Sequence, residues 1–375
     1  MDASSAVEPV SGEGWFPNRP PNRSGPGPYG AAQSRRSPMT APLASAAGSI
    51  SGRTVLVGVL GDPVRHSLSP AMHNAALRQL GLDWVYLALP TPAASLATVL
   101  NALEALGCRG LNVTIPHKQA VAALCRELSP LAQRLGAVNT LVPLPGGGWF
   151  GTNTDVEGFL APLRASTKPG PAGASWADQQ ALVLGCGGSA RAVVAALVEL
   201  GLGRITLVGR QAGKLATCLA ACRDWAPQLE TFVWPNQGQG YSDASRGDEG
   251  GSDEGGGNDS GGDELIQALA AAQLVVNTTP LGMAAAGDPQ ARELSPLQPW
   301  QLEALAPGSC VYDLIYTPRP TLLLRQATAR GCQGLDGLEM LVQQGAAALG
   351  LWSGVKELPV AAMRAAALEQ LQRRP

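Results

Sequence analysis

The sequence has no excess of charge of either sign and no long apolar run. Lysines and arginines number 27 against 29 aspartates and glutamates, which gives a net charge of -2. A basic surface for nucleic acid or for an anionic membrane is therefore not expected. No apolar run approaches the roughly 18 residues that a membrane-spanning helix requires. A hydrophobic content of 45% over 375 residues is instead enough to form two domain cores.

The sequence also lacks the cysteine and histidine spacings of disulfide frameworks and metal sites. Its seven cysteines include no Cys-x-x-Cys pair, and most lie in apolar surroundings, which predicts reduced thiols in a cytoplasmic protein. The three histidines are residues 66, 73 and 117, and they do not follow the His-x-x-x-His spacing. No metal site is therefore expected.

Two stretches have few large apolar residues that could form a core. Residues 1–52 are rich in Pro, Gly, Ser and Ala without periodicity, and residues 236–263 are rich in Gly, Ser and acidic residues. Both are predicted to be disordered, the first as an extension and the second as a surface insertion. A start at Met39 and a plastid transit peptide are alternatives for the extension, although its acidic residues argue against a transit peptide.

The rest of the chain alternates strand-like apolar runs with helical patterns, which predicts parallel sheets with crossover helices. In the first part, strands are expected at Thr54–Leu60, Trp84–Leu89 and Gly110–Val113, with helices between them and a hairpin (Val138–Leu144 and Trp149–Gly151) at the sheet edge. In the second part, strands are expected at Ala181–Leu184, Ile205–Val208, Leu229–Trp234, Leu274–Asn277 and Cys310–Leu314. Helices are expected near 188–200, 211–225, 264–272, 320–330, 337–350 and 358–372.

A glycine-rich turn follows the strand that begins at Ala181. Gly185 allows the tight turn, Gly187 lets the backbone approach a pyrophosphate, and Ala190 is small enough to pack against the sheet. The next helix offers unpaired N–H groups to a phosphate. Because the motif stands between a strand and a helix, it predicts a dinucleotide site rather than an ordinary turn.

The second strand of this part indicates which dinucleotide is bound. An NAD site normally places Asp or Glu about 20 residues after the glycine turn, but the stretch from Gly203 to Lys214 contains no acidic residue. Arg210 ends the strand instead, and Lys214 lies in the next helix. A guanidinium can bind a 2′-phosphate, so NADP(H) is predicted, although a solvated surface role for Arg210 is the alternative.

Lys118 and Asp155 are the candidate catalytic pair. Lys118 follows Pro116, which cannot continue a strand, so the lysine is predicted near the start of a helix, where its charge opposes the helix dipole. Asp155 begins the next helix, where aspartate is also a favoured N-cap. Only together do they indicate chemistry, because an ammonium beside a carboxylate can donate and recover a proton at a hydroxyl or carbonyl group.

Uncharged polar side chains end several of the predicted elements. They are Ser67, Ser69, Asn112, Thr114 and Asn139. Such groups suit a ligand that carries several hydroxyls, although each alone is more often a cap or a turn residue. Ser69, with Pro70 behind it, is predicted to be the N-cap of a helix that Gly81 closes.

From about Val57 to the C-terminus, these motifs resemble the shikimate dehydrogenase family. Ser67 and Ser69 match its Ser-x-Ser-Pro stretch, which binds the substrate carboxylate, and Asn112–Lys118 matches Asn-Val-Thr-x-Pro-x-Lys, whose lysine is catalytic. Asn139 falls on the asparagine of Val-Asn-Thr. Asp155 falls on the aspartate of Asn-Thr-Asp, the partner of that lysine.

Further matches follow in the second half of the chain. Asn277–Met283 resembles the segment on the nicotinamide side, Tyr312–Tyr316 the family's Tyr-Asp-x-x-Tyr, and Asp336–Gln344 its last substrate-contacting helix. The resemblance implies substrate binding by Ser67, Ser69, Asn112, Thr114, Lys118, Asn139, Asp155, Tyr316 and Gln344. It implies cofactor binding by Gly185, Gly187, Gly188, Ser189, Ala190, Arg210, Lys214, Asn277, Thr278, Met283, Leu314 and Gly337. One departure is Gly209-Arg210-Gln211, where the family often has Asn-Arg-Thr.

The resemblance implies a reversible, NADPH-dependent reduction of 3-dehydroshikimate to shikimate, in the pathway to chorismate and the aromatic amino acids. It also implies two α/β domains. Residues 53–154 plus 337–375 would form a mainly parallel substrate domain completed by C-terminal helices, and residues 155–336 a Rossmann-type NADP domain. A monomer or homodimer is expected. Alternatives are an NAD-dependent quinate/shikimate dehydrogenase and a non-catalytic Rossmann ligand sensor, which would be expected to lose Lys118 or Asp155.

Overall fold

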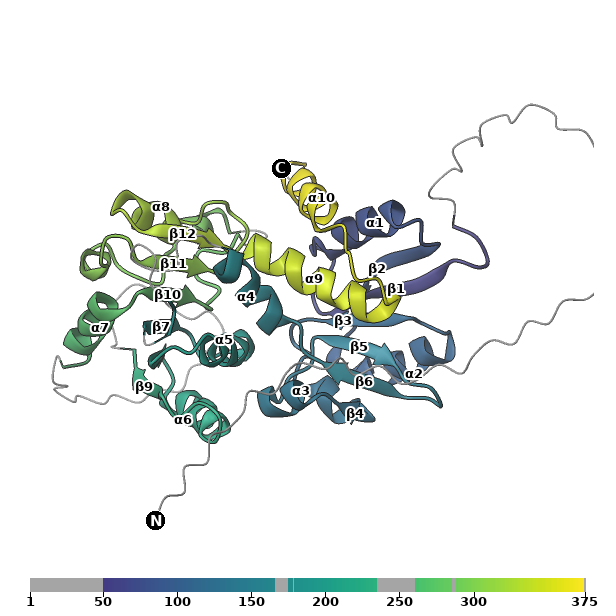
Figure 1. Cartoon of the computed structure of the whole chain (residues 1–375), viewed down its shortest axis with the longest axis horizontal. Coiled ribbons are helices and arrows are strands. Elements are labelled where there is room, and N and C mark those ends of the chain that lie inside the picture. Colours follow the sequence, from purple (N-terminus) through teal and green to yellow (C-terminus); the bar gives the residue numbers. More distant parts are fainter. Residues whose placement is uncertain (1–49, 166–174, 178, 235–259, 285–287, 374–375) are drawn as a thin grey trace, which may run out of the picture. The chain divides into compact units, whose positions relative to one another are not determined.

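The computed structural model describes residues 50–165, 175–177, 179–234, 260–284 and 288–373 (Figure 1). Most of the predicted N-terminal extension and of the predicted insertion lies outside these ranges. Residues 50–52 are exposed. Residues 260–263 belong to the helix α7 (Ser260–Ala271), so the prediction of disorder up to residue 263 is wrong at its C-terminal end.

Two six-stranded sheets, each built from one contiguous part of the chain, form the framework (Figure 1). The strands of the first are β1 (Val55–Gly61), β2 (Trp84–Pro90), β3 (Gly110–Val113), β4 (Glu127–Leu128), β5 (Thr140–Pro143) and β6 (Trp149–Thr152), in the order β2-β1-β3-β5-β6-β4. β1 pairs in parallel with β2 and β3, and β5 pairs antiparallel with β3 and β6. The predicted hairpin is β5–β6, but it does not form the edge, because β4 pairs with β6. A two-residue strand is too short to leave a sequence pattern.

Helices connect these strands, and two local predictions about them are wrong. The helices are α1 (Ser69–Gln79), α2 (Leu96–Ala105) and α3 (Pro130–Leu135), with the 3₁₀ helices η1 (Ala93–Ser95) and η2 (Ala120–Leu124). Ser69 is the first residue of α1 and not its N-cap, which is Leu68. Lys118 lies in a turn before η2 and not in a helix. Its carbonyl accepts a hydrogen bond from Val138 N at 2.8 Å, so it is not used for a helical bond.

The second sheet is entirely parallel. Its strands are β7 (Gln180–Leu184), β8 (Arg204–Gly209), β9 (Leu229–Val233), β10 (Leu274–Asn277), β11 (Cys310–Asp313) and β12 (Gln333–Asp336), in the order β12-β11-β10-β7-β8-β9. The order reverses between β7 and β10, as in doubly wound dinucleotide-binding sheets. The sequence analysis missed β12, whose residues Gln, Gly, Leu and Asp form no apolar run. The remaining elements are α5 (Gly188–Glu199), α6 (Ala212–Cys222), α8 (Leu322–Ala329), η3 (Pro289–Glu293) and η4 (Gln301–Ala304).

Two C-terminal helices, α9 (Gly337–Ser353) and α10 (Val360–Gln372), pack with elements of the first sheet. Their apolar residues Val342, Trp352 and Met363 form one buried cluster with Met72 of α1 and Tyr86 of β2. Trp352 Nε1 donates to Leu141 O at 3.0 Å. The predicted α/β fold is thus confirmed: a mainly parallel domain completed by C-terminal helices, and a Rossmann-type domain.

Candidate active site

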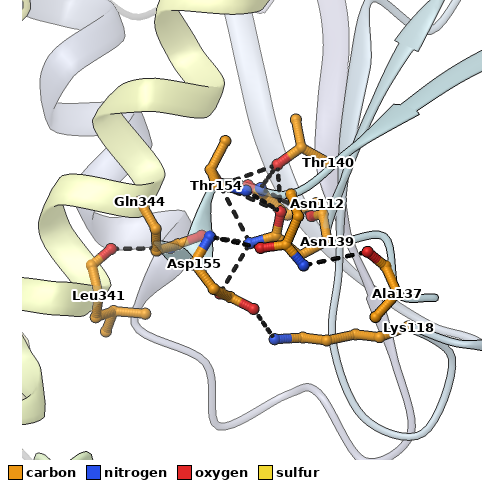
Figure 2. Close-up of polar contacts among 10 residues, drawn as sticks. Asn112, Lys118, Ala137, Asn139, Thr140, Thr154, Asp155, Leu341 and Gln344 are labelled. Carbon is orange, nitrogen blue, oxygen red and sulfur yellow. Dashed lines mark hydrogen bonds and ion pairs between the residues drawn. The ribbon is translucent and has the colours of Figure 1, made fainter. Parts of the chain in front are cut away.

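Lys118 and Asp155 face each other, with Lys118 Nζ 2.6 Å from Asp155 Oδ2 (Figure 2). Lys118 comes from the turn after β3, and Asp155 is the first residue of α4 (Asp155–Ala165). Their side chains are 19% and 9% exposed, so the ion pair lies near the surface but is largely shielded. The structure therefore brings together the two side chains that the sequence predicted to act as a pair.

The carboxylate of Asp155 is held through both of its oxygens. Oδ2 contacts Lys118, and Oδ1 accepts a hydrogen bond from Asn139 Nδ2 at 2.9 Å. The backbone N–H of Asp155 donates to Asn153 Oδ1 at 2.9 Å, and Asn153 Nδ2 donates to Ala137 O at 3.2 Å. The N-terminal position in α4 also favours a negative charge. This arrangement leaves the carboxylate little freedom to rotate.

Asn139 is the centre of the polar cluster in Figure 2. Its Oδ1 accepts from Thr154 N at 2.8 Å and from Thr140 Oγ1 at 2.9 Å. Its Nδ2 also lies 3.4 Å from Oε1 of Gln344, which comes from α9. The amide orientation is fixed by these bonds, because reversing it would place N–H groups against the donors. Gln344, far away in the sequence, thereby lies next to Asn139, another residue of the predicted substrate site.

Asn112 is linked to the same cluster through its side chain. Its Nδ2 lies 3.3 Å from both Asn139 O and Thr140 Oγ1, and its Oδ1 accepts from the hydroxyl of Tyr86 at 2.8 Å. Burial raises the pKa of Tyr86 well above its ordinary value of 10, so the phenol stays protonated and can donate. Tyr86 stacks on His73 with ring centroids 4.1 Å apart.

The sequence analysis missed three members of this cluster, Tyr86, Thr140 and Thr154. A tyrosine in an otherwise apolar strand is a usable signal, because a buried phenol usually needs a hydrogen-bond partner. The two threonines belong to the Val-Asn-Thr and Asn-Thr-Asp motifs, but within these motifs only Asn139 and Asp155 were assigned a role.

The other predicted substrate residues are less closely tied to this cluster. Ser67 Oγ accepts from Ser69 N at 3.1 Å, which is a turn interaction. Ser69 is buried, and a hydrogen bond from its side chain to Tyr86 opposes the rise in the pKa of that phenol. Thr114 is half-buried, and its backbone N–H donates to Leu60 O at 2.9 Å. Tyr316 is half-buried against the apolar cluster that contains Val342 and Trp352.

The glycine turn after β7 has the geometry that the dinucleotide motif requires. Gly185 has φ +101°, and a Cβ there would lie 2.8 Å from Thr278 Oγ1. Gly187 and Gly188 are not buried, and a Cβ on either would meet no atom within 4 Å. Gly187 is the N-cap of α5 and makes no side-chain bond, so the first N–H groups of that helix are open to an anion. Ala190, in contrast, is fully buried.

Arg210 and Lys214 lie beside this turn, after β8 and in α6, and both are exposed. Within the described part of the chain, neither forms an ion pair with a carboxylate. Their exposed side chains can reach a 2′-phosphate bound at this turn. The residues present fit NADP(H): an open glycine turn at a helix N-terminus, and two cations where an NAD site has an acid.

The remaining predicted cofactor residues differ in accessibility. Thr278 is half-buried and Met283 is 47% exposed, but Asn277 is fully buried and its amide is bonded within the protein. A Cβ on Gly337 would lie 1.9 Å from Leu314 O, so only glycine allows that approach of α9 to the loop after β11. Because Asn277 is buried, it can hold neighbouring residues in place but cannot itself reach a ligand. Ser189 is half-buried in the first turn of α5.

Among the residues that the structure describes, no group of His, Cys, Asp and Glu side chains is placed to hold a metal ion. No helix within the described ranges is long and apolar enough to cross a membrane.

Two family models match separate parts of the sequence, and curated relatives match most of its length. Models of the shikimate dehydrogenase substrate binding domain and of the shikimate 5'-dehydrogenase C-terminal domain match residues 59–141 and 337–368. A curated shikimate dehydrogenase (NADP(+)) from Synechococcus sp. (strain JA-2-3B'a(2-13)) is 46% identical over 324 residues, which is 86% of this chain and 98% of that protein.

Solved structures agree with these matches. Shikimate 5-dehydrogenase from Thermus thermophilus, in complex with NADP(H) and shikimate, is 34% identical with a TM-score of 0.66, and the match covers 85% of this chain and all of that one (100%). Quinate dehydrogenase from Corynebacterium glutamicum, in complex with NAD, is 29% identical with a TM-score of 0.68, over 84% of this chain and 99% of that one.

Proposed function

Because this chain belongs to the shikimate dehydrogenase (NADP(+)) family, we propose that its Lys118–Asp155 pair catalyses the reversible reduction of 3-dehydroshikimate to shikimate with NADPH. The observation that carries the assignment of the catalytic pair is the 2.6 Å contact between these two side chains, within a cluster of uncharged polar groups. A polyhydroxylated ligand is recognised by such groups, because each can donate to or accept from a hydroxyl.

NADPH held by the glycine turn and by Arg210 would supply the hydride that the reduction of the carbonyl group requires. Lys118 donates its proton to the carbonyl oxygen, which would otherwise become an alkoxide. Asp155 keeps the ammonium directed at that oxygen and can accept a hydrogen bond from a neighbouring hydroxyl of the ligand. In the oxidation direction the neutral amine takes the hydroxyl proton. The partial exposure of Lys118, 19%, lets it exchange that proton with solvent.

We assign the binding roles from the same arrangement. Asn112, Asn139 and Gln344 would hold ring hydroxyls, and Ser67 and Ser69 the carboxylate, with Thr114 and Tyr316 completing the substrate site. The glycine turn would bind the pyrophosphate and Arg210 with Lys214 the 2′-phosphate. Thr278, Met283 and Leu314 would lie on the nicotinamide side, close to Gly337.

The division of labour between domains also belongs to this proposal. Residues 53–154 with 337–375 would bind substrate, and residues 155–336 would bind NADP. We further propose a cytoplasmic enzyme that acts as a monomer or a homodimer. Sedimentation of the purified protein with and without NADP would distinguish the two states.

Initial rates with shikimate or quinate, each measured with NADP and with NAD, test the proposal. We expect the highest kcat/KM with shikimate and NADP. The quinate dehydrogenase among the similar structures, crystallised with NAD, makes the quinate and NAD combination the relevant competitor. A higher kcat/KM for that combination would overturn the proposed specificity, and no turnover with any combination would favour a ligand sensor.

A further inference from the structure

Asp313 is a buried carboxylate that no step of the proposed reaction uses. It is the last residue of β11, and in the sheet register it lies between Asn277 of β10 and Asp336 of β12. All three residues are therefore at the carboxyl ends of parallel strands, the edge at which open α/β sheets bind ligands. Asp313 itself is fully buried, so it cannot be a ligand contact.

Three neutral donors from three different segments hold this carboxylate. Oδ1 accepts from Asn277 Nδ2 at 2.9 Å and from Ile315 N at 3.1 Å, and Oδ2 accepts from Thr321 Oγ1 at 2.7 Å. Burial raises the pKa of Asp313 to about 6, while these hydrogen bonds act in the opposite direction. The group is thus charged at neutral pH. Bonds to a charged acceptor are about twice as strong as neutral ones, so the three segments are firmly tied together.

Asn277 links Asp313 to the loop that lies beside the glycine turn. With its Nδ2 held by Asp313, the amide presents Oδ1 to Thr279 N at 2.9 Å and to Thr279 Oγ1 at 2.7 Å. If the Asn277 amide were reversed, its oxygen would face the carboxylate of Asp313 and its NH₂ group would face the N–H of Thr279. Next to it, Thr278 Oγ1 donates to Leu184 O at 2.8 Å, at the end of β7. Asp313 thereby sets the loop that lies against Gly185.

From Ile315 the connection continues to the start of α9. Ile315 O accepts from Gly337 N at 3.1 Å, beside the close approach of Leu314 O to Gly337. The loops after β10 and β11 are also joined directly, because Ala284 N donates to Thr317 O at 2.9 Å. The loops after β10 and β11 are therefore one connected unit with Asp313 beneath it.

We propose that Asp313 is a positioning residue for cofactor binding, because it holds the Asn277–Thr279 loop and the Leu314–Ile315 loop in the arrangement that forms the nicotinamide side of the dinucleotide site. The inference rests on the proposed function, which makes Thr278, Met283 and Leu314 cofactor contacts. A loop that is ordered before binding loses less conformational entropy on binding. Asp313 therefore contributes to NADP affinity without touching NADP.

The test compares dissociation constants measured by calorimetry for NADP and for shikimate. Asp313→Ala is expected to weaken NADP binding about tenfold or more, because both loops must then be ordered when NADP binds, and to weaken shikimate binding much less. Asp313→Asn keeps the size and can accept from Asn277 while donating to the Thr321 hydroxyl, so it should restore most of the affinity. Ser309→Ala is the matched control. Ser309 is buried immediately before β11, and within the described residues its hydroxyl bonds only to Cys332 Sγ.

A second pair of variants keeps the test decisive if Asp313→Ala does not fold. Thr321→Val removes one donor to the carboxylate, and Thr321→Ser retains it; we expect only the valine variant to bind NADP several-fold more weakly. Equal loss of NADP and shikimate affinity, or wild-type NADP affinity in both Asp313→Ala and Thr321→Val, would overturn the inference. Failure of the proposed function looks different, because the wild-type protein would then not oxidise shikimate with NADP.

Discussion

Lys118 and Asp155 are 37 positions apart in the chain, yet their charged atoms lie 2.6 Å apart. Neither side chain is free to move away easily. The backbone carbonyl of Lys118 accepts a hydrogen bond from Val138 N, and the carboxylate of Asp155 accepts one from Asn139 Nδ2. The pair is thus set before substrate arrives, which is the condition for effective proton transfer from a side chain.

Lys118→Ala should lower kcat by about 10²–10⁴-fold, the usual contribution of a positioned proton donor. Shikimate should still bind, because the polar groups around Asn139 and Asn112 do not depend on the lysine. Turnover and the dissociation constant of shikimate, measured on the same preparation, check both parts. Lys356→Ala, at an exposed position, is the control and should have wild-type kcat. A Lys118→Ala variant with near-normal kcat would remove this lysine from the mechanism.

Much of this arrangement could be predicted because it depends on local requirements. Gly185 is visible in the sequence because a turn with positive φ after a strand favours glycine. Lys118 is visible because it follows Pro116, which cannot continue the preceding strand, although the segment there is a turn and not the predicted helix. The parallel sheets follow from the alternation of apolar runs with helical segments. Each of these signals lies within a few residues of the feature it predicts.

The parts that were missed depend on contacts between distant segments. Tyr86 of β2 reaches Asn112 of β3 across the intervening strand β1, and only strand order and register determine that contact. Asp313 belongs to the Tyr-Asp-x-x-Tyr motif. Its bonds to Asn277 and Thr321, however, depend on the folded chain, in which β10 and β11 are side by side. Lys118 was assigned to a helix because a tertiary bond from Val138 could not be anticipated.

The glycine turn allows a test that separates folding from cofactor binding. Gly187 has φ -80°, which any residue adopts, and a Cβ there meets no protein atom within 4 Å. Gly187→Ala should therefore keep the wild-type melting temperature but bind NADP about tenfold or more weakly, because the methyl group takes the place of the pyrophosphate. Thermal melting without ligand and calorimetry with NADP provide the two measurements.

Gly185→Ala is the contrasting variant at the same turn. Its φ of +101° and the 2.8 Å distance from a Cβ to Thr278 Oγ1 predict a lower melting temperature in the absence of any ligand. If Gly187→Ala bound NADP as tightly as the wild type, the pyrophosphate would not approach the backbone at this turn.

Arg210→Ala should change the choice between the two nicotinamide cofactors. One charge-assisted bond to the 2′-phosphate contributes about 1.5–3 kcal/mol, so kcat/KM with NADP should fall about tenfold to a hundredfold or slightly more. The value with NAD should stay the same, because NAD lacks that phosphate. Arg223→Ala, at the other end of α6, should change neither value. An equal fall with both cofactors would assign Arg210 to a structural role.

His73 should make the protein less stable as the pH falls below about 6.5. Burial lowers the pKa of His73 from 6.5 to about 3, and neither ring nitrogen has a hydrogen-bond partner among the residues that the structure describes. Between these pH values the unfolded chain binds a proton that the folded protein excludes, so the free energy of unfolding falls by up to about 1.4 kcal/mol per pH unit. Urea unfolding of the wild type and of His73→Phe, at pH values between 5 and 7, measures this slope.

The phenylalanine variant keeps an aromatic ring against Tyr86, whose centroid is 4.1 Å from that of His73, but it cannot take up a proton. Overpacking against Gly345 would lower its stability by the same amount at every pH, so the comparison depends on the slope and not on the level. We expect the difference in unfolding free energy between the two proteins to shift by about 1.6 kcal/mol in favour of the variant from about pH 6.5 to about pH 5. Parallel plots of unfolding free energy against pH for the two proteins would mean that His73 is protonated in the folded protein or accessible to solvent.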